Sequence, residues 1–568
     1  MAAVRRSRAI IQRARRNTPT SSVQMVRSPR RRAHGVNERR WAAALARKPI
    51  AASLMAIMAR LALQHIPGSP ARGPCYPCRM ARSTVRFWFS IIVIPTFLVV
   101  AVLGYFAWRQ SVPGVRAILE PVPRWIGVKT PLAVDLHAVR GGVRSVEIRL
   151  KQGPARVVLT KQAFTGPESS AQRIELVING GTLGLREGGA VLEVRARDGF
   201  WRPIRVDDKP VASIPVTLDF TPPSVEVVSA TRYWAKGGGG LVVVRSRGAS
   251  RVAVGVGPLS FRAYPAGPPD SNLHVAIVAL PWNYEVGTPI AAIAQDEAGN
   301  TTTRNVAVEV KGRRFRSDVI DVKDDFLERK LPELLPERGG VIPRDQLLEA
   351  FLTVNRDRRK QAEETKRTLA AKTQPRPLWD GVFLQPRNTK VFSNFAETRT
   401  YRYHGREVDT QVHFGYDLAA VRHGPVPAAN AGVVVFAGPL SIYGNTVIVD
   451  HGLGLQTLYA HLSTIGVKEG DQVRQEQELG RSGDSGLAMG DHLHFEVLIG
   501  GISVTPVEWW DARWIRDHIG RPLREASLLL IESIMPELAK EQAAPPPRRR
   551  RAAAVPPRSQ PTTKTESP

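Results

Sequence analysis

Cysteine is almost absent from this sequence, which has 568 residues but only two cysteines, Cys75 and Cys78, in Cys-Tyr-Pro-Cys. A single pair of thiols does not complete a tetrahedral zinc site, and no strand-then-helix pattern around it indicates a thioredoxin-type redox motif. Everything after residue 78 lacks cysteine. The rest of the chain therefore folds without disulfides, and we interpret the two cysteines as incidental members of a loose segment.

Acidic residues are scarce near the N-terminus. Residues 1–79 hold 17 lysines and arginines but a single acid, Glu38, so +16 of the formal charge of +29 lies there. The remaining residues carry +13 and contain no basic stripe with interleaved aromatic residues, the pattern that a nucleic-acid surface requires. We therefore expect no nucleic-acid partner.

Charge is missing altogether from residues 87–108, which Arg86 and Arg109 bracket. As a helix this run is roughly 33 Å long at about 1.5 Å per residue, enough to cross the hydrocarbon core of a bilayer. Arginines crowd its N-terminal side, which places that side in the cytoplasm and residue 109 onward outside. We predict a single-pass transmembrane helix; a cleaved signal peptide is the alternative.

The segment before this run, residues 1–86, is rich in arginine and has no periodic apolar pattern. We predict it to be cytoplasmic and disordered. Because Met80 opens a short basic flank directly before the apolar run, translation starting at Met80 is an alternative explanation for the composition of this segment.

Short β-branched runs bounded by turn residues follow the apolar segment. The clearest are 143–150, 157–160, 191–196 and 241–244. Weak internal similarity relates 191–199 to 290–300, and Asp-Phe-Thr-Pro-Pro (219–223) lies between the two units. We predict two β-sandwich modules that resemble bacterial immunoglobulin-like domains, at 125–220 and 221–312, and interpret them as spacers.

The periodicity then changes. Residues 318–372 carry apolar residues at helical spacing and predict a helical connector, whereas 385–510 consist of glycine-bounded β-branched runs typical of a compact antiparallel sheet. An amphipathic stretch predicts helix within 511–541, and the Pro- and Arg-rich tail, 542–568, is predicted to be disordered. The expected fold class is mainly β: an antiparallel sheet domain preceded by β-sandwich modules, a helical connector and one transmembrane helix.

Histidine concentrates in the predicted sheet domain, where seven of the twelve histidines fall between His404 and His494. His492 and His494 point to the same face if they lie on a strand, because side chains alternate along a strand. With His413 and Asp417 from another segment, they have the composition of a zinc site that keeps an open position. Such a site indicates hydrolysis more often than a structural role.

Four motifs occur along this region, and they resemble those of one family. They are His-Phe-Gly-Tyr-Asp (413–417), the Gly-Asn strand (444–452), Tyr-Ala-His-Leu (459–462) and His-Leu-His-Phe-Glu (492–496). In this order they closely resemble the lysostaphin-type (LytM-like) zinc endopeptidases, which cut peptidoglycan cross-bridges. The resemblance covers about residues 388–508 and implies a zinc endopeptidase domain.

The resemblance also implies a role for each motif residue. His413, Asp417 and His494 match the ligands of one Zn²⁺ per chain, and His461 and His492 match two histidines that act in catalysis beside the metal. Zinc lowers the pKa of its bound water and polarises the scissile carbonyl. One imidazole accepts the water proton and the other donates to the developing oxyanion. Which of the two is the base stays open.

Several residues depart from the family pattern. Ala396 and Glu476 replace usual glycines in turns, and Asp491 replaces a frequent proline before His-x-His; none of them removes a ligand. The family also uses a tyrosine upstream of the first ligand, but neither Tyr401 nor Tyr403 matches its spacing well. The other histidines of this region are predicted to lie at the surface or beside ligands: His404, His423 and His451.

The topology and the resemblance together predict an inner-membrane protein whose catalytic domain faces the periplasm and hydrolyses peptide cross-links of peptidoglycan. Its expected partners are peptidoglycan, the membrane, and other envelope or division proteins. One alternative is a catalytically silent regulator of other wall hydrolases, as in family members that have lost zinc ligands, although all the ligand positions are filled here. A second is an adhesin-like binding protein. A further hypothesis is that residues 318–390 cover the groove and hold activity low.

Overall fold

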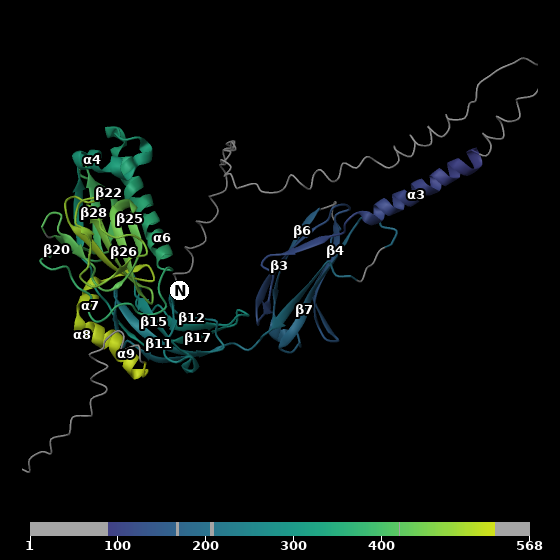
Figure 1. Ribbon diagram of the computed structural model, residues 1–568, viewed down its shortest axis with the longest axis horizontal. Coiled ribbons are helices and arrows are strands. Elements are labelled where there is room, and N and C mark those ends of the chain that lie inside the picture. The colour runs from purple at the N-terminus through teal and green to yellow at the C-terminus, as the bar shows by residue number, and fades with distance from the viewer. Residues whose placement is uncertain (1–88, 166–169, 205–208, 420, 529–568) are drawn as a thin grey trace, which may run out of the picture. The chain divides into compact units, whose positions relative to one another are not determined.

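The computed structural model describes residues 89–165, 170–204, 209–419 and 421–528 (Figure 1). Within these residues strands predominate, most of the sheets are antiparallel, and one apolar helix lies near the N-terminus. The predicted fold class, mainly β, is confirmed. The predictions for residues 1–86 and 542–568 lie outside the described residues.

The apolar helix begins with the π-helical turn η1 (Phe89–Val93) and continues as α3 (Ile94–Ser111). Ile91–Ser111 is long and apolar enough to cross a membrane, and none of this window is buried. A helix in the core of a soluble protein would be covered by neighbours. The exposed helix therefore fits a membrane anchor or a signal sequence, and it ends three residues beyond the predicted limit at residue 108.

Two sheets form the first β module and enclose their own apolar core. One sheet contains β1 (Arg116–Leu119), β3 (Thr130–His137) and β6 (Ala171–Ile178); the other contains β2 (Trp125–Ile126), β8 (Ala212–Leu218), β7 (Gly188–Asp198), β4 (Val143–Gln152) and β5 (Ala155–Ala163), and the short helix η2 is Gly180–Thr182. The predicted runs 143–150, 157–160 and 191–196 fall within β4, β5 and β7. Val146, Ile148 and Leu150 alternate into the core, as a period of two requires.

The second β module has two sheets as well, each with four strands. Their strands are β14 (Tyr264–Pro265), β15 (Leu273–Ala279), β11 (Gly239–Arg247) and β9 (Ser224–Ala230), then β13 (Leu259–Arg262), β12 (Arg251–Val256), β16 (Ile290–Gln295) and β17 (Thr301–Asn305); β10 (Tyr233–Ala235) pairs with β18 (Glu309–Lys311), and η3 is Pro269–Ser271. The predicted run 241–244 lies in β11. In the Asp-Glu-Ala-Gly-Asn turn (296–300), the backbone N–H and the side-chain amide of Asn300 donate hydrogen bonds to the carboxylate of Asp296 at 2.8 and 2.9 Å.

The segment predicted as a helical connector begins with a strand. β19 (Ser317–Val322) pairs in parallel with β21 (Glu397–Tyr403), and the β-branched residues Val319, Ile320 and Val322 favour an extended strand. The helices that follow are α4 (Asp324–Leu334), η4 (Pro336–Arg338), η5 (Arg344–Gln346), α5 (Leu347–Leu352), the π-helical η6 (Thr353–Arg358) and α6 (Arg359–Leu369). We call residues 323–372 the connector.

The C-terminal domain is built on an eight-stranded sheet. Its strands are β20 (Lys390–Ser393), β23 (Tyr416–Ala419), β31 (Leu493–Ile499), β27 (Leu455–Leu462), β26 (Asn445–Gly452), β25 (Gly432–Pro439), β29 (Gln472–Val473) and β32 (Ile502–Val504); β22 (Arg406–His413) pairs with β21, β24 (Pro425–Pro427) and β28 (Thr464–Ile465) flank β30 (Glu478–Arg481), and η7 is Ser441–Tyr443. Every residue of β27 and β31 is buried. These two central strands are therefore covered on both faces.

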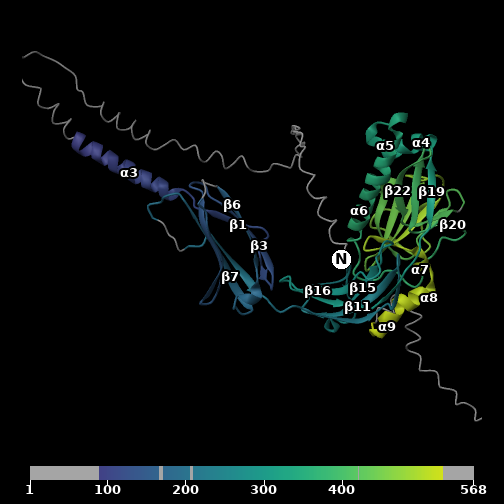
Figure 2. The same ribbon diagram turned by 180° about the vertical axis from the view of Figure 1, so that it is seen from behind.

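Each face of β31 belongs to a different apolar core. Phe495, Val497 and Ile499 pack in a core that also contains residues of the second module, whereas Leu498 packs in a core built with the connector helices. Figures 1 and 2 show α4 and α6 beside the sheet domain, and the helices after the sheet beside β11. His494 lies on the same face as Leu498, so the connector covers the face of β31 that carries the histidines.

Helices follow the sheet, within the segment predicted as helical at 511–541. They are α7 (Pro506–Trp510), α8 (Ala512–Ile515), η8 (Arg516–Gly520) and α9 (Arg521–Glu525). The part of the prediction beyond residue 528 lies outside the described residues. Trp509, Ile519 and Leu523 are fully buried in the core shared with the second module.

Glu508 is a buried carboxylate between α7 and the second module. Its Oε2 accepts a hydrogen bond from the backbone N–H of Gly239 at 2.9 Å, and its Oε1 lies 3.5 Å from Nη2 of Arg313. Burial raises the pKa of Glu508 to about 7, although Gly239 and Arg313 favour its charged form. The folded protein therefore holds a proton there that an unfolded chain, with a pKa near 4.5, releases.

This raised pKa predicts that the contribution of Glu508 to stability falls as the pH rises from about 4.5 to about 7. We expect Glu508→Gln to leave stability nearly unchanged at pH 4.5 and to raise it at pH 8, by up to about 3 kcal/mol. Thermal unfolding of both proteins across this range measures the difference, and Glu407→Gln, an exposed carboxylate, is the matched control. A constant difference at every pH would contradict the prediction.

Candidate metal centre

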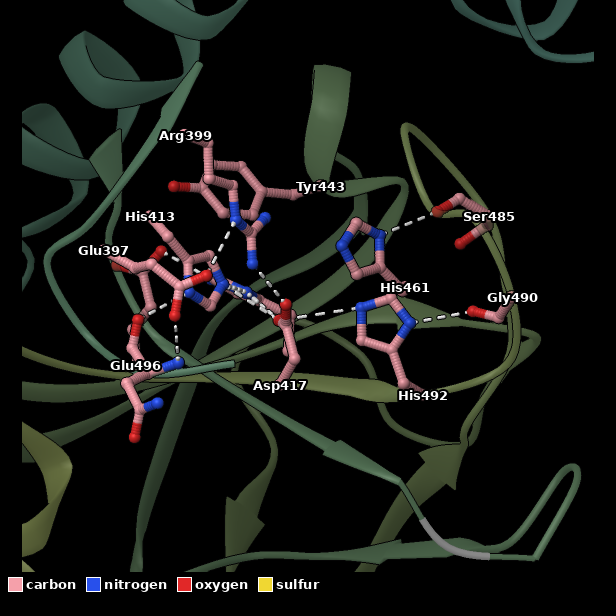
Figure 3. Close-up of polar contacts among 12 residues, drawn as sticks. Glu397, Arg399, His413, Asp417, Tyr443, His461, Ser485, Gly490, His492 and Glu496 are labelled. Carbon is pink, nitrogen blue, oxygen red and sulfur yellow. Dashed lines mark hydrogen bonds and ion pairs between the residues drawn. The ribbon is translucent and has the colours of Figure 1, made fainter. Parts of the chain in front are cut away.

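His413, Asp417 and His494 converge at one point of the sheet (Figure 3). His413 ends β22, Asp417 lies on β23, and β23 pairs with β31 so that Asp417 is opposite His494. Nε2 of His413, Oδ1 of Asp417 and Nδ1 of His494 lie 2.9 Å from one another in every pairing. All three residues are buried. Two imidazole nitrogens and a carboxylate oxygen brought this close can hold a metal ion.

The outer atoms of the two histidine rings are held by hydrogen bonds. Nδ1 of His413 contacts the carbonyl oxygen of Asn394 at 2.9 Å, and Nε2 of His494 contacts Oε1 of Glu496 at 3.0 Å. Since an N–H must donate to each of these oxygens, the facing nitrogens keep free lone pairs that point toward the shared centre. This arrangement fits zinc, which prefers neutral imidazoles and a carboxylate.

The electrostatics of His413 and Asp417 agree with this donor set, whereas the carboxylates of Asp417 and Glu496 raise the pKa of His494 despite its burial. Burial lowers the pKa of His413 to about 4, so its ring is neutral at neutral pH. Burial alone would raise the pKa of Asp417, but His413 and the neighbouring histidines outweigh it and hold that pKa well below the usual range. Nη2 of Arg399 also donates to Oδ2 of Asp417 at 2.8 Å, which leaves Oδ1 to face the centre.

His461 and His492 lie side by side next to this centre, with ring centroids 4.8 Å apart. Nδ1 of His461 contacts the carbonyl oxygen of Ser485 at 2.8 Å, and Nδ1 of His492 contacts that of Gly490 at 2.7 Å, as Figure 3 shows. Each ring therefore keeps Nε2 free of the backbone. Nε2 of His492 lies 3.6 Å from Oδ1 of Asp417.

The backbone of His461 adopts a left-handed conformation, with φ of 60°. This conformation costs conformational free energy in a non-glycine residue, so it is maintained only where the surrounding structure requires it. Burial, with repulsion from His492 and His494, lowers the pKa of His461 well below its usual value. The side chain is therefore neutral at neutral pH, and one of its ring nitrogens carries a lone pair.

A cavity of about 470 Å³ opens over these residues. All five predicted site residues line it, together with Arg399 and Tyr401 and with Phe326 and Phe351 of the connector. Phe392 and Met489 also line it and are 53% and 62% exposed, so this part of the cavity faces solvent. The cavity has room for a peptide segment above the histidines.

Backbone geometry explains why glycine is usual at two of the positions where this chain departs from the family pattern. Ala396 and Glu476 have φ of 60° and 68°, in the left-handed region where glycine is the usual residue. Gly415, which follows His413 by two residues, is required for space: a Cβ there would lie 2.8 Å from the ring of His494 and 2.5 Å from the carbonyl oxygen of Phe495.

The remaining histidines of the region lie apart from the three converging ligands. His404 is exposed and contacts Asp324 at 2.9 Å, His423 lies 3.3 Å from Asp491, and the buried His451 contacts the hydroxyl of Thr457 at 2.8 Å. Of the two upstream tyrosines, Tyr401 lines the cavity, with its ring 5.6 Å from that of Phe351. Tyr403 stacks on His404 at 4.0 Å.

Sequence reasoning missed Arg399, Tyr443, Glu496 and Lys366 as neighbours of the centre. Glu496 was detectable, because it shares a strand face with His492 and His494. Arg399 shares a face with Tyr401 in the same way, but nothing in the sequence sets its distance from Asp417. Lys366 lies on a helix more than a hundred residues before its partner Glu496, and no local sequence pattern indicates such a contact.

Comparison with known proteins identifies the domain that carries this centre. Residues 411–506 match Peptidase family M23, so the chain contains a domain of this family, and the predicted resemblance is confirmed. M23 peptidases of the lysostaphin type are zinc metalloproteases, in agreement with the His-Asp-His cluster.

Curated relatives share this domain. The DD-carboxypeptidase/endopeptidase Mpg of Neisseria meningitidis is 39% identical over 117 residues, which are 21% of this chain and 27% of that protein. The peptidoglycan DD-endopeptidase ShyA of Vibrio cholerae is 35% identical over 119 residues, again 21% and 27% of the two chains. The chain thus matches about a quarter of the length of these relatives. Among solved structures, the catalytic domain of lysostaphin from Staphylococcus simulans is 27% identical, with 22% of this chain and 92% of that chain covered and a TM-score of 0.19.

Proposed function

We propose that this protein is a membrane-anchored zinc endopeptidase that hydrolyses peptide cross-links of peptidoglycan. The observation that carries the proposal is the convergence of His413, Asp417 and His494, with two more histidines in the same cavity. A silent regulator has no need for a complete donor set with both outer ring nitrogens held in place. The name of the relative ShyA, a peptidoglycan DD-endopeptidase, supports peptidoglycan as the substrate.

We assign His413, Asp417 and His494 as ligands of one zinc ion. When bound, zinc supplies a Lewis acid that acidifies water and polarises a carbonyl. His461 is the better candidate for the general base, because its Nδ1 is held by Ser485, whereas Nε2 of His492 lies 3.6 Å from Oδ1 of Asp417. His492, 3.6 Å from the ligand carboxylate, is then placed to donate to the developing oxyanion.

The exposed apolar helix Ile91–Ser111 supports anchoring in the inner membrane, with the catalytic domain in the periplasm. On that side of the membrane the domain meets the cell wall. Partners among envelope or division proteins would bind the β modules, for which we propose a spacer role.

Metal removal tests the proposed chemistry. We expect the purified full chain to contain one zinc ion, to release muropeptides from isolated peptidoglycan, to lose this activity on chelation, and to regain it with one equivalent of zinc. Elemental analysis and chromatography of the digests measure both properties. A folded protein that neither binds zinc nor releases muropeptides would favour the regulator instead.

A further inference from the structure

Lys366 of α6 is a fully buried lysine in the connector, with none of its side chain exposed. Its Nζ lies 2.9 Å from Oε2 of Glu496 and 2.8 Å from Oε1 of Glu363, and it donates to the hydroxyl of Tyr443 at 3.0 Å. Removing an ammonium group from water costs several kcal/mol unless it is paired and hydrogen-bonded. Here three oxygens satisfy its three N–H donors.

Glu496, the partner of Lys366 that also contacts a candidate metal ligand, is completely buried. One of its oxygens, Oε2, accepts from Lys366 and from the hydroxyl of Ser503, the latter at 2.6 Å. The other, Oε1, accepts from Nε2 of His494 at 3.0 Å. A continuous chain of charged and polar contacts therefore joins the connector to a candidate metal ligand.

We propose that Lys366 is a positioning residue that holds Glu496 in the orientation in which Glu496 fixes the ring of His494. The proposal rests on the proposed zinc site and adds that the metal centre is completed by the connector, outside the matched domain at 411–506. Lys366 touches neither substrate nor metal. It acts through one carboxylate on one ligand.

The physical basis is the competition for Glu496. With Lys366 in place, Oε2 is satisfied and Oε1 stays directed at His494. Without Lys366, a buried carboxylate keeps Ser503 and His494 as its polar contacts and gains by turning toward incoming water. His494 then loses the contact that fixes its tautomer and ring angle. Loss of such a partner typically weakens metal binding about 10- to 100-fold.

This role is distinct from a cover over the groove. Phe326 and Phe351 of the connector line the cavity, as a cover would. A connector that only blocks access gives higher activity and unchanged zinc affinity when its contacts are weakened. A connector that completes the centre gives lower zinc affinity, and the two roles are therefore separable by measurement.

The test compares Lys366→Met with the wild type in the full-length, detergent-solubilised protein. Lys366→Met keeps an unbranched apolar side chain one heavy atom shorter than lysine and removes the ammonium group. Zinc affinity, measured by competition with a chromophoric chelator, is expected to fall about 10- to 100-fold. In Lys366→Met with Glu496→Gln both charges of the pair are gone, while the amide oxygen still accepts from His494, so affinity is expected to return to within about threefold of the wild type.

Lys330→Met is the matched control. Lys330 is another buried connector lysine, with a side chain 5% exposed, and its contacts are Glu333 and Asp484 rather than a metal ligand or its partner. We expect Lys330→Met to lower the melting temperature without changing zinc affinity. A general loosening of the connector would instead weaken zinc binding equally in both variants, and that result overturns the proposal.

The other outcomes are equally decisive. A folded Lys366→Met protein with wild-type zinc affinity overturns the positioning role. If Lys366→Met does not fold, a folded double variant that binds zinc normally supports the proposal, and a double variant that also fails to fold overturns it. Muropeptide release is measured separately: its absence in a zinc-bound wild type counts against the endopeptidase or indicates a covered groove, while the zinc comparison still tests Lys366.

Discussion

His494→Ala is expected to abolish both zinc retention and muropeptide release. The substitution removes one of three converging donor atoms and leaves His413 and Asp417, 2.9 Å apart, as a two-ligand site. It also leaves Glu496 without the ring that its Oε1 contacts. Loss of the hydrogen-bond partner of a ligand typically weakens metal binding about 10- to 100-fold. Loss of the ligand itself should weaken zinc binding more than that.

Zinc content after gel filtration and digestion of isolated peptidoglycan measure the two losses together. His404→Ala serves as the control, because His404 is an exposed histidine of the same domain that contacts Asp324. It should retain both properties. If folded His494→Ala protein kept one zinc ion per chain, the ligand assignment would be wrong.

His461→Ala is expected to have a different phenotype: normal zinc content with turnover reduced about 10²- to 10⁴-fold. Nε2 of His461 faces the cavity, and its Nδ1 is occupied by the carbonyl oxygen of Ser485. The ring therefore offers a lone pair to the reacting water without contributing to the metal site. A loss of this size corresponds to about 3 to 5 kcal/mol of transition-state stabilisation.

Steady-state kinetics on a soluble cross-linked muropeptide, with metal content measured on the same sample, separates catalysis from metal binding. His451→Ala is the control for the loss of a buried imidazole. His451 is a buried histidine of the same sheet, and it contacts Thr457 and the carbonyl oxygen of Ala431. It should lower stability more than turnover of the folded fraction. His461→Ala protein that turns over at the wild-type rate would exclude His461 as the base.

Local sequence patterns indicated a metal site only in part. His492 and His494 lie two residues apart and share a strand face, whereas the assignment of His413, Asp417 and His494 as the ligand set came from the family resemblance, because His413 and Asp417 lie on different strands. The mainly β fold was predictable from local patterns: runs such as 241–244 are β-branched and bounded by turns.

Contacts between distant segments were not predictable. Lys366 and Glu496 pair across 130 residues, and although Glu496 shares a strand face with the histidines, Lys366 alone looks like an ordinary surface charge of a helix. The strand Ser317–Val322 was assigned to a helical connector because its partner β21 begins about eighty residues later, and pairing decides its conformation more than composition does. Arg399 was missed because a hairpin, not a motif, brings it to Asp417.

The buried central strands have a consequence for engineering. Since β27 and β31 pack against the core shared with the second module on one side and against the core built with the connector on the other, neither strand presents a face to water. A fragment cut at the limits of the matched domain would expose the apolar residues on both faces of these strands and would be prone to aggregate. The smallest transferable piece suggested by these cores begins at the second module, near residue 224, and extends to about residue 528.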